Sequence, residues 1–173
     1  MSPEMIFRIQ LVLGYVVWLL CFGAYVWPRL KALDAASAHR AIATLHAFRI
    51  FGLVFILPGV VGRLPAGFGT FAAYGDLATG VLATLALLTF RRRPLFWSFV
   101  VAFNVVGVSD LLLDYLHATQ LDLPRVAGEL GSTYAIPVLY VPVLMITHVA
   151  AFYLLARSRR RTTRSIAGLP AAS

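Results

Sequence analysis

Apolar residues along the chain gather into five long runs, which short segments rich in Gly, Pro and charged residues separate. Each run has about 20 residues, the length that an α-helix needs to cross the hydrocarbon core of a bilayer. We therefore predict an all-α fold: a polytopic membrane protein built as a five-transmembrane-helix bundle, one domain over residues 1–157. The predicted spans cover about residues 5–27, 41–61, 71–90, 94–117 and 134–156.

Proline and glycine indicate where the predicted helices end or bend. Pro28 is expected to end the first helix, because proline has no N–H to donate and its ring clashes with the preceding turn. Pro58, followed by a glycine, predicts a kink or an early stop in the second span. Residues 124–130 suit a short surface helix that Gly131 ends. The basic segment 158–173 is predicted to be a disordered cytoplasmic tail.

The fourth run differs from an inert span because it carries polar residues among its apolar ones. At about 100° per residue, one arc of about 140° contains Asn104, Gly107, Asp110, Leu111, Asp114 and His117. The opposite side is almost wholly Phe, Val and Leu. A helix facing lipid would not place an amide and two carboxylates along one side. We therefore expect this helix at the centre of the bundle, with its polar side turned inward.

Composition and charge agree with a membrane protein. The chain is 60% hydrophobic and only 13% charged, about half the charged fraction of a soluble domain. The formal net charge of +8 comes largely from Arg91–Arg93 and Arg157–Arg164. Each cluster directly follows an apolar run, where basic residues mark the cytoplasmic side and contact anionic lipid head groups. We predict a bacterial inner-membrane protein with its N-terminus outside and its C-terminus inside, and no nucleic-acid partner.

Polar residues in the other spans can be placed by depth, at about 1.5 Å per residue. The third span carries Asp76 on a side made of small residues, which let helices approach closely. The predicted inner layer contains His46, Arg49, Asn104 and His148. The predicted outer layer contains Asp76, Asp110, Asp114 and Tyr140.

Arg49 is the residue whose burial most needs an explanation, because a guanidinium keeps its charge in proteins. Asp76 would lie roughly 9 Å nearer the outer surface at the predicted depths. Arg49 therefore either reaches toward Asp76 or faces carbonyls, water or an anionic ligand. The separation in depth favours the ligand.

Three functions suit such a bundle. In the first, which we prefer, the interior binds or translocates a proton, an ion or a small polar or anionic solute, because acids and histidines in membranes mark such paths. Five helices are few for a transporter, so a homo-oligomer is expected with it. In the second, a redox protein holds haem b through His46 and His148, which lie on different helices at similar depth. In the third, the protein is a ligand-free structural or assembly factor. The predicted site consists of His46, Arg49, Asp76, Asn104, Asp110, Asp114, Tyr140 and His148.

Catalysis is less expected than binding. The sequence has no P-loop, GxSxG or HExxH motif. Its only lysine, Lys31, lies between spans, so a retinal Schiff base within a helix is excluded.

Three runs carry a resemblance to known proteins: HAFRIFGLVFILPGVVG (His46–Gly62), AFNVVGVSDLLLDY (Ala102–Tyr115) and YAIPVLYVPVLMITH (Tyr134–His148). They resemble runs in small uncharacterised polytopic inner-membrane proteins of bacteria. The resemblance covers most of the chain and implies the membrane class, and it brings no activity, cofactor or site residue with it.

Overall fold

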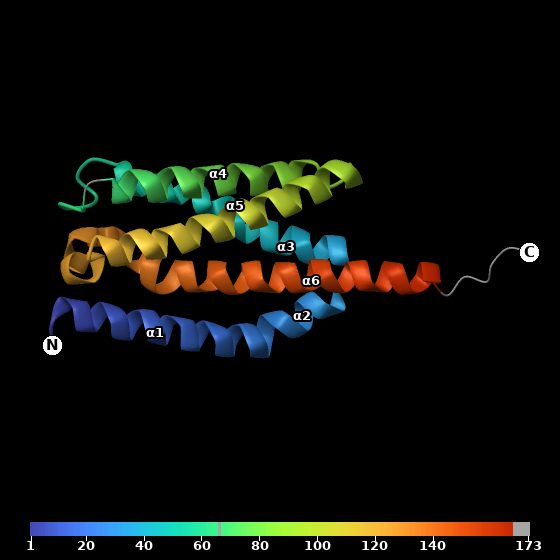
Figure 1. The fold of residues 1–173 in the computed structure, drawn as a ribbon, viewed down its shortest axis with the longest axis horizontal. Coiled ribbons are helices and arrows are strands. Elements are labelled where there is room, and N and C mark those ends of the chain that lie inside the picture. The colour runs from blue at the N-terminus through green and yellow to red at the C-terminus, as the bar shows by residue number, and fades with distance from the viewer. Residues whose placement is uncertain (66, 168–173) are drawn as a thin grey trace, which may run out of the picture.

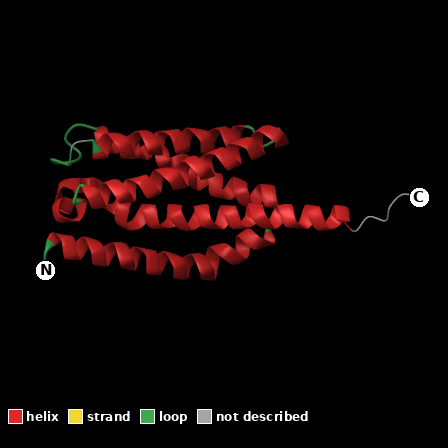
Figure 2. Cartoon of the chain, in the orientation of Figure 1, coloured by secondary structure: helices red, strands yellow, loops and turns green. Residues whose placement is uncertain are grey.

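The computed structural model describes residues 1–65 and 67–167, and every regular element in this part of the chain is helical (Figures 1 and 2). Five helices are long and apolar enough to cross a membrane, and they lie along the long axis of the molecule. They cover Pro3–Ala32, Ala35–Ile56, Phe68–Leu88, Arg93–Gln120 and Ile136–Arg157. The five-helix prediction is therefore confirmed.

The prediction that the first helix ends at Pro28 was wrong, because the helix continues past this residue. It consists of α1 (Pro3–Cys21), a π-helical segment η1 (Phe22–Val26) and α2 (Trp27–Ala32), which carries Pro28 in its first turn. A wider π turn ahead of the proline accommodates the missing N–H and the ring, so the helix bends instead of stopping.

The second span begins six residues earlier than predicted. Its first part, α3 (Ala35–Ala47), starts after Asp34, whose carboxylate accepts hydrogen bonds from the backbone N–H groups of Ala36 and Ser37. Asp is among the best residues at this position, because its oxygen satisfies N–H groups that lack a helical partner. The 3₁₀ segment η2 (Phe48–Ile56) follows and ends just before Pro58, as an early stop requires.

The two following helices form the closest-packed part of the bundle. In α4 (Phe68–Leu88) the buried face carries Ala72, Ala73, Asp76, Thr79, Gly80, Ala83 and Ala86. This face packs against α3, η2 and α5 (Arg93–Gln120). In α5, Asn104, Gly107 and Asp110 are buried while Val101 and Val105 are exposed. The predicted inward-facing polar side of this helix is confirmed.

The fifth span is the most buried of the five, so α5 shares the central position with it. It consists of the π-helical η4 (Ile136–Tyr140) and α6 (Val141–Ala167). Before it, the 3₁₀ segment η3 (Leu123–Tyr134) covers the predicted surface helix and breaks at Gly131, whose φ is +54°. The backbone of α6 continues into the predicted tail, and residues 168–173 lie outside the described residues.

The first span lies along one side of the bundle and is the least buried (Figure 1). Two hydrogen bonds attach it to η4 and η3: Trp18 Nε1 donates to the Leu139 carbonyl at 2.8 Å, and Tyr134 Oη donates to Gln10 Oε1 at 2.6 Å. Tyr15 Oη pairs with Tyr115 Oη at 2.6 Å and so connects α1 to α5. These contacts close the side of the bundle on which the cavity described below lies.

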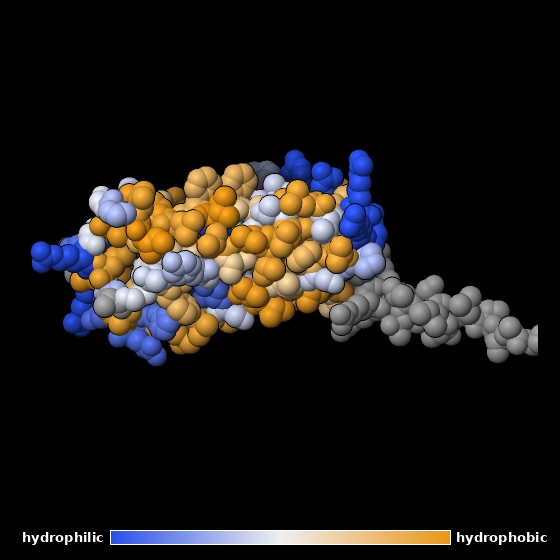
Figure 3. Space-filling view, turned by 90° about the horizontal axis from the view of Figure 1, so that it is seen from above, coloured by the Kyte–Doolittle hydropathy of each residue, from blue (hydrophilic) through white to orange (hydrophobic). Residues whose placement is uncertain are grey.

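The surface shows the distribution expected of a membrane-crossing bundle. In Figure 3 an apolar band covers the middle of the molecule, and hydrophilic residues gather at its two ends. Exposed Leu, Val, Ile and Phe side chains on all five spans form this band. Apolar side chains facing outward over this length suit contact with lipid chains.

Candidate functional site

Arg49 lies at the centre of the polar interior, and its side chain is fully buried. Its Nε donates to Asp76 Oδ1 on α4 at 2.6 Å, and its Nη2 donates to Asp110 Oδ2 on α5. Its Nη1 donates to the backbone carbonyl of Gly107 at 3.2 Å. One guanidinium thus joins three spans through two ion pairs and a carbonyl.

The predicted separation of Arg49 from the acids was wrong, and the start of the second span explains the error. The segment Ala35–Arg40 is small and polar and was assigned to a loop, but it forms the first turns of α3. Six added residues amount to about 9 Å of helix. This equals the predicted separation, so Arg49 lies level with Asp76. The anionic ligand favoured by the depth argument is therefore not required.

The helical form of η2 also positions Arg49. In a 3₁₀ helix, residues three apart lie on one face, and the buried residues of η2 are Arg49, Gly52 and Phe55. Runs of 3₁₀ helix longer than four residues are uncommon, and within a longer helix they often mark a functional or strained segment. Here the tightened turn gives one inward-facing line of residues within a segment whose other residues are exposed or half-buried.

Glycines make room for the two carboxylates. A Cβ added at Gly52 would meet the carboxylate of Asp76, and one added at Gly75 would meet that of Asp110. Any larger residue at either position would displace the acid that pairs with Arg49. Sequence reasoning missed both glycines as part of the site. A glycine inside a span is common in membrane helices, so only the position of the facing acid identifies them.

A second polar cluster lies one turn away, around His46 and His148. Both histidines are fully buried, and their ring centroids lie 4.0 Å apart with an interplanar angle of 37°. His148 Nδ1 pairs with Asn104 Oδ1 at 2.9 Å, and His46 Nε2 pairs with Thr147 Oγ1 at 3.0 Å. The histidines approach each other across the bundle, as their predicted depths require. Thr147 was missed as a member of the site.

The neighbours of the histidines define their tautomers. Asn104 Nδ2 donates to the Val100 carbonyl at 2.8 Å, so its Oδ1 is an acceptor and His148 Nδ1 carries the hydrogen. The Thr147 hydroxyl donates to the Val143 carbonyl at 2.8 Å, so it accepts from His46 Nε2. The remaining ring nitrogens, His46 Nδ1 and His148 Nε2, have no hydrogen-bond partner. Each of these nitrogens suits the lone pair of a neutral imidazole, because a proton there would add a buried charge without a partner.

This arrangement does not fit haem ligation by the pair. Two axial bonds of about 2 Å would keep the coordinating nitrogens about 4 Å apart, with the iron between them and the ring centroids farther still. The centroids themselves lie 4.0 Å apart, so an iron would require the rings to separate. Among the described residues, no group of three or more His, Cys, Asp or Glu side chains is placed to hold a metal ion.

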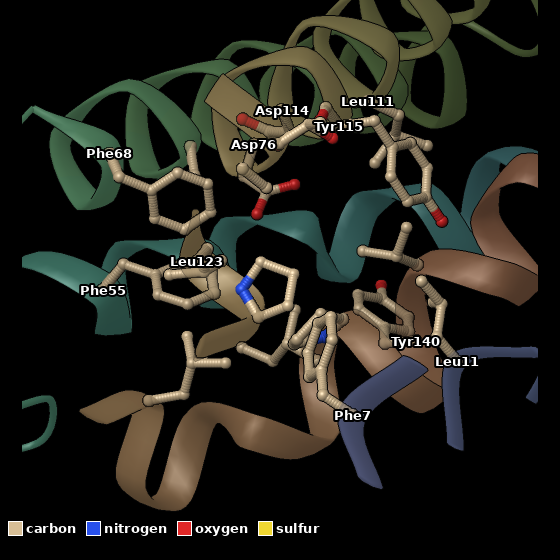
Figure 4. Close-up of a pocket in the computed structure, with 18 of the residues that line it drawn as sticks. Phe7, Leu11, Phe55, Phe68, Asp76, Leu111, Asp114, Tyr115, Leu123 and Tyr140 are labelled. Carbon is tan, nitrogen blue, oxygen red and sulfur yellow. The ribbon is translucent and has the colours of Figure 1, made fainter. Parts of the chain in front are cut away.

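A cavity of about 120 Å³ lies beside the Arg49 network, lined by residues of all five spans and of η3. Most of its wall is apolar, and it includes Phe7, Phe55 and Phe68. In Figure 4, Asp76 and Asp114 lie on the side formed by α4 and α5, and Tyr140 lies across from them. Pro137, in the π-helical segment η4, also lines this cavity.

The polar groups of the cavity wall divide into engaged hydroxyls and a free carboxylate. Tyr140 Oη donates to the Leu45 carbonyl at 3.1 Å, and Thr119 Oγ1 donates to the Tyr115 carbonyl at 2.8 Å. The Tyr115 hydroxyl pairs with Tyr15. Asp114 Oδ1 is buried and has no hydrogen-bond partner. The lining residues therefore include two carboxylates: that of Asp76, which pairs with Arg49, and that of Asp114, which has the unpartnered oxygen.

The eight predicted site residues fall into three groups. Arg49, Asp76 and Asp110 form the ion-paired network, while His46, Asn104 and His148 form the histidine cluster. Asp114 and Tyr140 line the cavity, which Asp76 also borders. Gly107 connects the first two groups, since its carbonyl accepts from Arg49 and a Cβ added there would lie 2.6 Å from His148 Nε2.

Comparisons with known proteins give a family and no activity. Neither a curated protein nor a solved structure matches the chain. The model of a domain of unknown function, DUF8737, matches residues 6–156, so the chain belongs to that family.

Proposed function

We propose that this protein binds a proton or a small positively charged solute at Asp114, inside a cavity in the outer half of a bacterial inner membrane. The observation that carries the proposal is the unpartnered buried oxygen of Asp114 at the cavity wall. An ionised carboxylate without a partner in the hydrocarbon region costs about 2.5–3.5 kcal/mol or more. A proton or a bound cation would remove this cost.

The balance of charge supports a cation over an anion. Three carboxylates, those of Asp76, Asp110 and Asp114, lie in this half of the bundle with one guanidinium, that of Arg49. Arg49 directs all of its described hydrogen bonds to Asp76, Asp110 and a carbonyl. No cationic group among the cavity-lining residues is left to attract an anion. The predicted ligand, which was a proton, an ion or a small polar or anionic solute, therefore narrows to a proton or a small cation.

The placement in the membrane follows from the basic clusters. Arg91–Arg93 and Arg157–Arg164 support an N-terminus outside and a C-terminus inside. The cavity, lined by Phe7 of α1 and Leu123 of η3, then lies in the outer half. Irregular helix at η2 and η4 borders it, and such backbone within a membrane suits a wall of a polar cavity.

The ligand-free alternative has one observation in its favour, which is the internal pairing of Arg49. A self-satisfied bundle would show this network. It would not need a cavity with an unpaired acid beside the network. The binding proposal and the ligand-free alternative therefore assign different roles to Asp114 and the same role to Arg49.

Infrared spectroscopy of the protein in lipid nanodiscs tests the proposal. We expect a protonated carboxylic acid band at neutral pH that Asp114→Asn removes. The matched control is Asp122→Asn, because Asp122 lies in a loop and pairs with Arg125 at 2.9 Å. The proposal fails if Asp114→Asn leaves the band unchanged across the pH range in which the protein is folded.

A further inference from the structure

We infer that the solute taken by this cavity is a small organic ammonium, with a compact apolar body of about the size of a benzene ring. The ammonium group would bind at Asp114, and the apolar body would fill the space between α1, η2 and η3. This inference rests on the proposed function and names the class of its ligand. It follows from three features of the cavity: volume, hydrogen-bonding groups and aromatic wall.

The volume sets the size of the ligand. The cavity measures about 120 Å³, and an apolar cavity of about 150 Å³ in another protein accommodates benzene. The cavity here is somewhat smaller, so the apolar body is expected to be a short branched chain or at most a single ring, and a bicyclic body would not fit. An inorganic cation alone would leave most of the apolar wall in contact with empty space.

The hydrogen-bonding groups of the cavity wall favour a ligand that donates a hydrogen bond. The three wall hydroxyls, those of Tyr115, Thr119 and Tyr140, are engaged with protein atoms. Asp114 Oδ1 is the buried atom without a partner. An ammonium N–H donates to such an oxygen in a charge-assisted hydrogen bond, which is roughly twice as strong as a neutral one. A carboxylate ligand would find no cationic side chain among the described lining residues.

The aromatic part of the wall suits the body of such a ligand. Phe55 and Phe68 meet edge to face, with ring centroids 6.3 Å apart, and Phe7 approaches from α1 (Figure 4). Aromatic faces attract a nearby cation as well as apolar groups. Apolar contact on one side and a carboxylate on the other describe an amphipathic cation. Phosphate-bearing or strongly hydrated solutes have no counterpart on this wall.

Three probes of similar shape test this class: benzylamine, benzyl alcohol and benzoate. Calorimetric titration of the protein in nanodiscs, with empty nanodiscs subtracted, is expected to give saturable binding of benzylamine. Benzyl alcohol should bind at least about tenfold more weakly, because it lacks the charge-assisted bond. Benzoate should not bind. Equal affinities for the amine and the alcohol would overturn the inference.

Variants assign the binding to this cavity. Asp114→Asn should weaken benzylamine at least about tenfold and leave benzyl alcohol unchanged, and Asp114→Glu should restore part of the affinity. Ala118→Phe, which fills the cavity from a half-buried position of the wall, should abolish binding of both. Unchanged benzylamine affinity in Asp114→Asn would contradict the inference. Thermal unfolding of each variant confirms that it is folded.

The infrared experiment distinguishes a failure of the proposed function from a failure of the inference about the ammonium ligand. If Asp114→Asn removes the carboxylic acid band and benzylamine does not bind, the acid takes a proton only, so the inference fails while the proposed function stands. If the variant leaves the band unchanged and benzylamine does not bind, both fail. If benzylamine binds and reduces the band, the ammonium displaces the proton of Asp114, and both are supported.

Discussion

The Arg49 network and the histidine cluster lie one turn apart on the second span, and they keep buried polar groups stable in different ways. Arg49 cannot lose its charge, so two carboxylates from two helices surround it. His46 and His148 can remain neutral, so one hydrogen bond each suffices and a ring nitrogen of each is left unpaired. A fixed charge therefore determines the packing of three helices, whereas a neutral ring tolerates a missing partner.

The largest effect should come from removing the fixed charge. Arg49→Ala leaves Asp76 and Asp110 buried without a cation, and we expect it to destabilise the fold by about 3–5 kcal/mol. Unfolding in mixed micelles with increasing denaturing detergent measures this. Arg63→Ala is the control, because Arg63 is exposed in a loop, and it should change stability by less than about 0.5 kcal/mol.

The space around the network should matter next. Gly52→Ala or Gly75→Ala places a Cβ against the carboxylate of Asp76 or Asp110. We expect a loss of about 1–3 kcal/mol, as for overpacking in a core. Gly23→Ala is the matched control, because a Cβ at this helical position meets nothing within 4 Å. If all three variants were equally stable, the acids would not be held where the structure places them.

The histidine cluster should respond more weakly. His148→Leu leaves Asn104 Oδ1 without its donor, and we expect a loss of about 1–2 kcal/mol. A double-mutant cycle with Asn104→Leu should give a coupling near 0.6 kcal/mol, the average for hydrogen bonds between membrane helices. A coupling as large as that of an ion pair would show that His148 carries a charge in the folded protein.

We expect the smallest effect on stability at Asp34, whose carboxylate is exposed to water, unlike the carboxylates inside the bundle. Hydrogen bonds from Ser37 lower the pKa of Asp34 below its ordinary value of 3.8. The stabilisation by this helix cap is therefore present above pH 3.8 and is lost as the pH falls through the lowered pKa. Asp34→Asn keeps an acceptor at the cap at every pH. The wild type should lose stability relative to this variant in acid, and identical pH profiles would contradict the role of Asp34.

Much of the fold could be predicted because it depends on the lengths of the apolar runs and on the helical periodicity of polar and small residues. The five spans, the inward polar side of α5 and the small-residue face of α4 all follow from these patterns. The approach of His46 to His148 followed from depth alone. These features depend on many residues at once, so errors of a few residues at the span ends do not remove them.

The contacts of Arg49 could not be predicted for two physical reasons. Ala35–Arg40 has the composition of a loop, and only the cap at Asp34 indicates that the helix starts there. The change from α-helix to 3₁₀ helix at Phe48 has no local signal that we can identify. The bend at Pro28 was missed for a related reason, since a π segment replaced the expected helix end.

Two double-mutant cycles test most directly the central claim that Arg49 is paired within the protein while Asp114 is left for the ligand. One cycle combines Arg49→Ala with Asp76→Ala, and the other combines Arg49→Ala with Asp114→Ala, both measured by unfolding in mixed micelles. We predict a coupling of about 2–3 kcal/mol for Arg49 with Asp76 and less than about 0.5 kcal/mol for Arg49 with Asp114. A stronger coupling to Asp114 than to Asp76 would contradict the account.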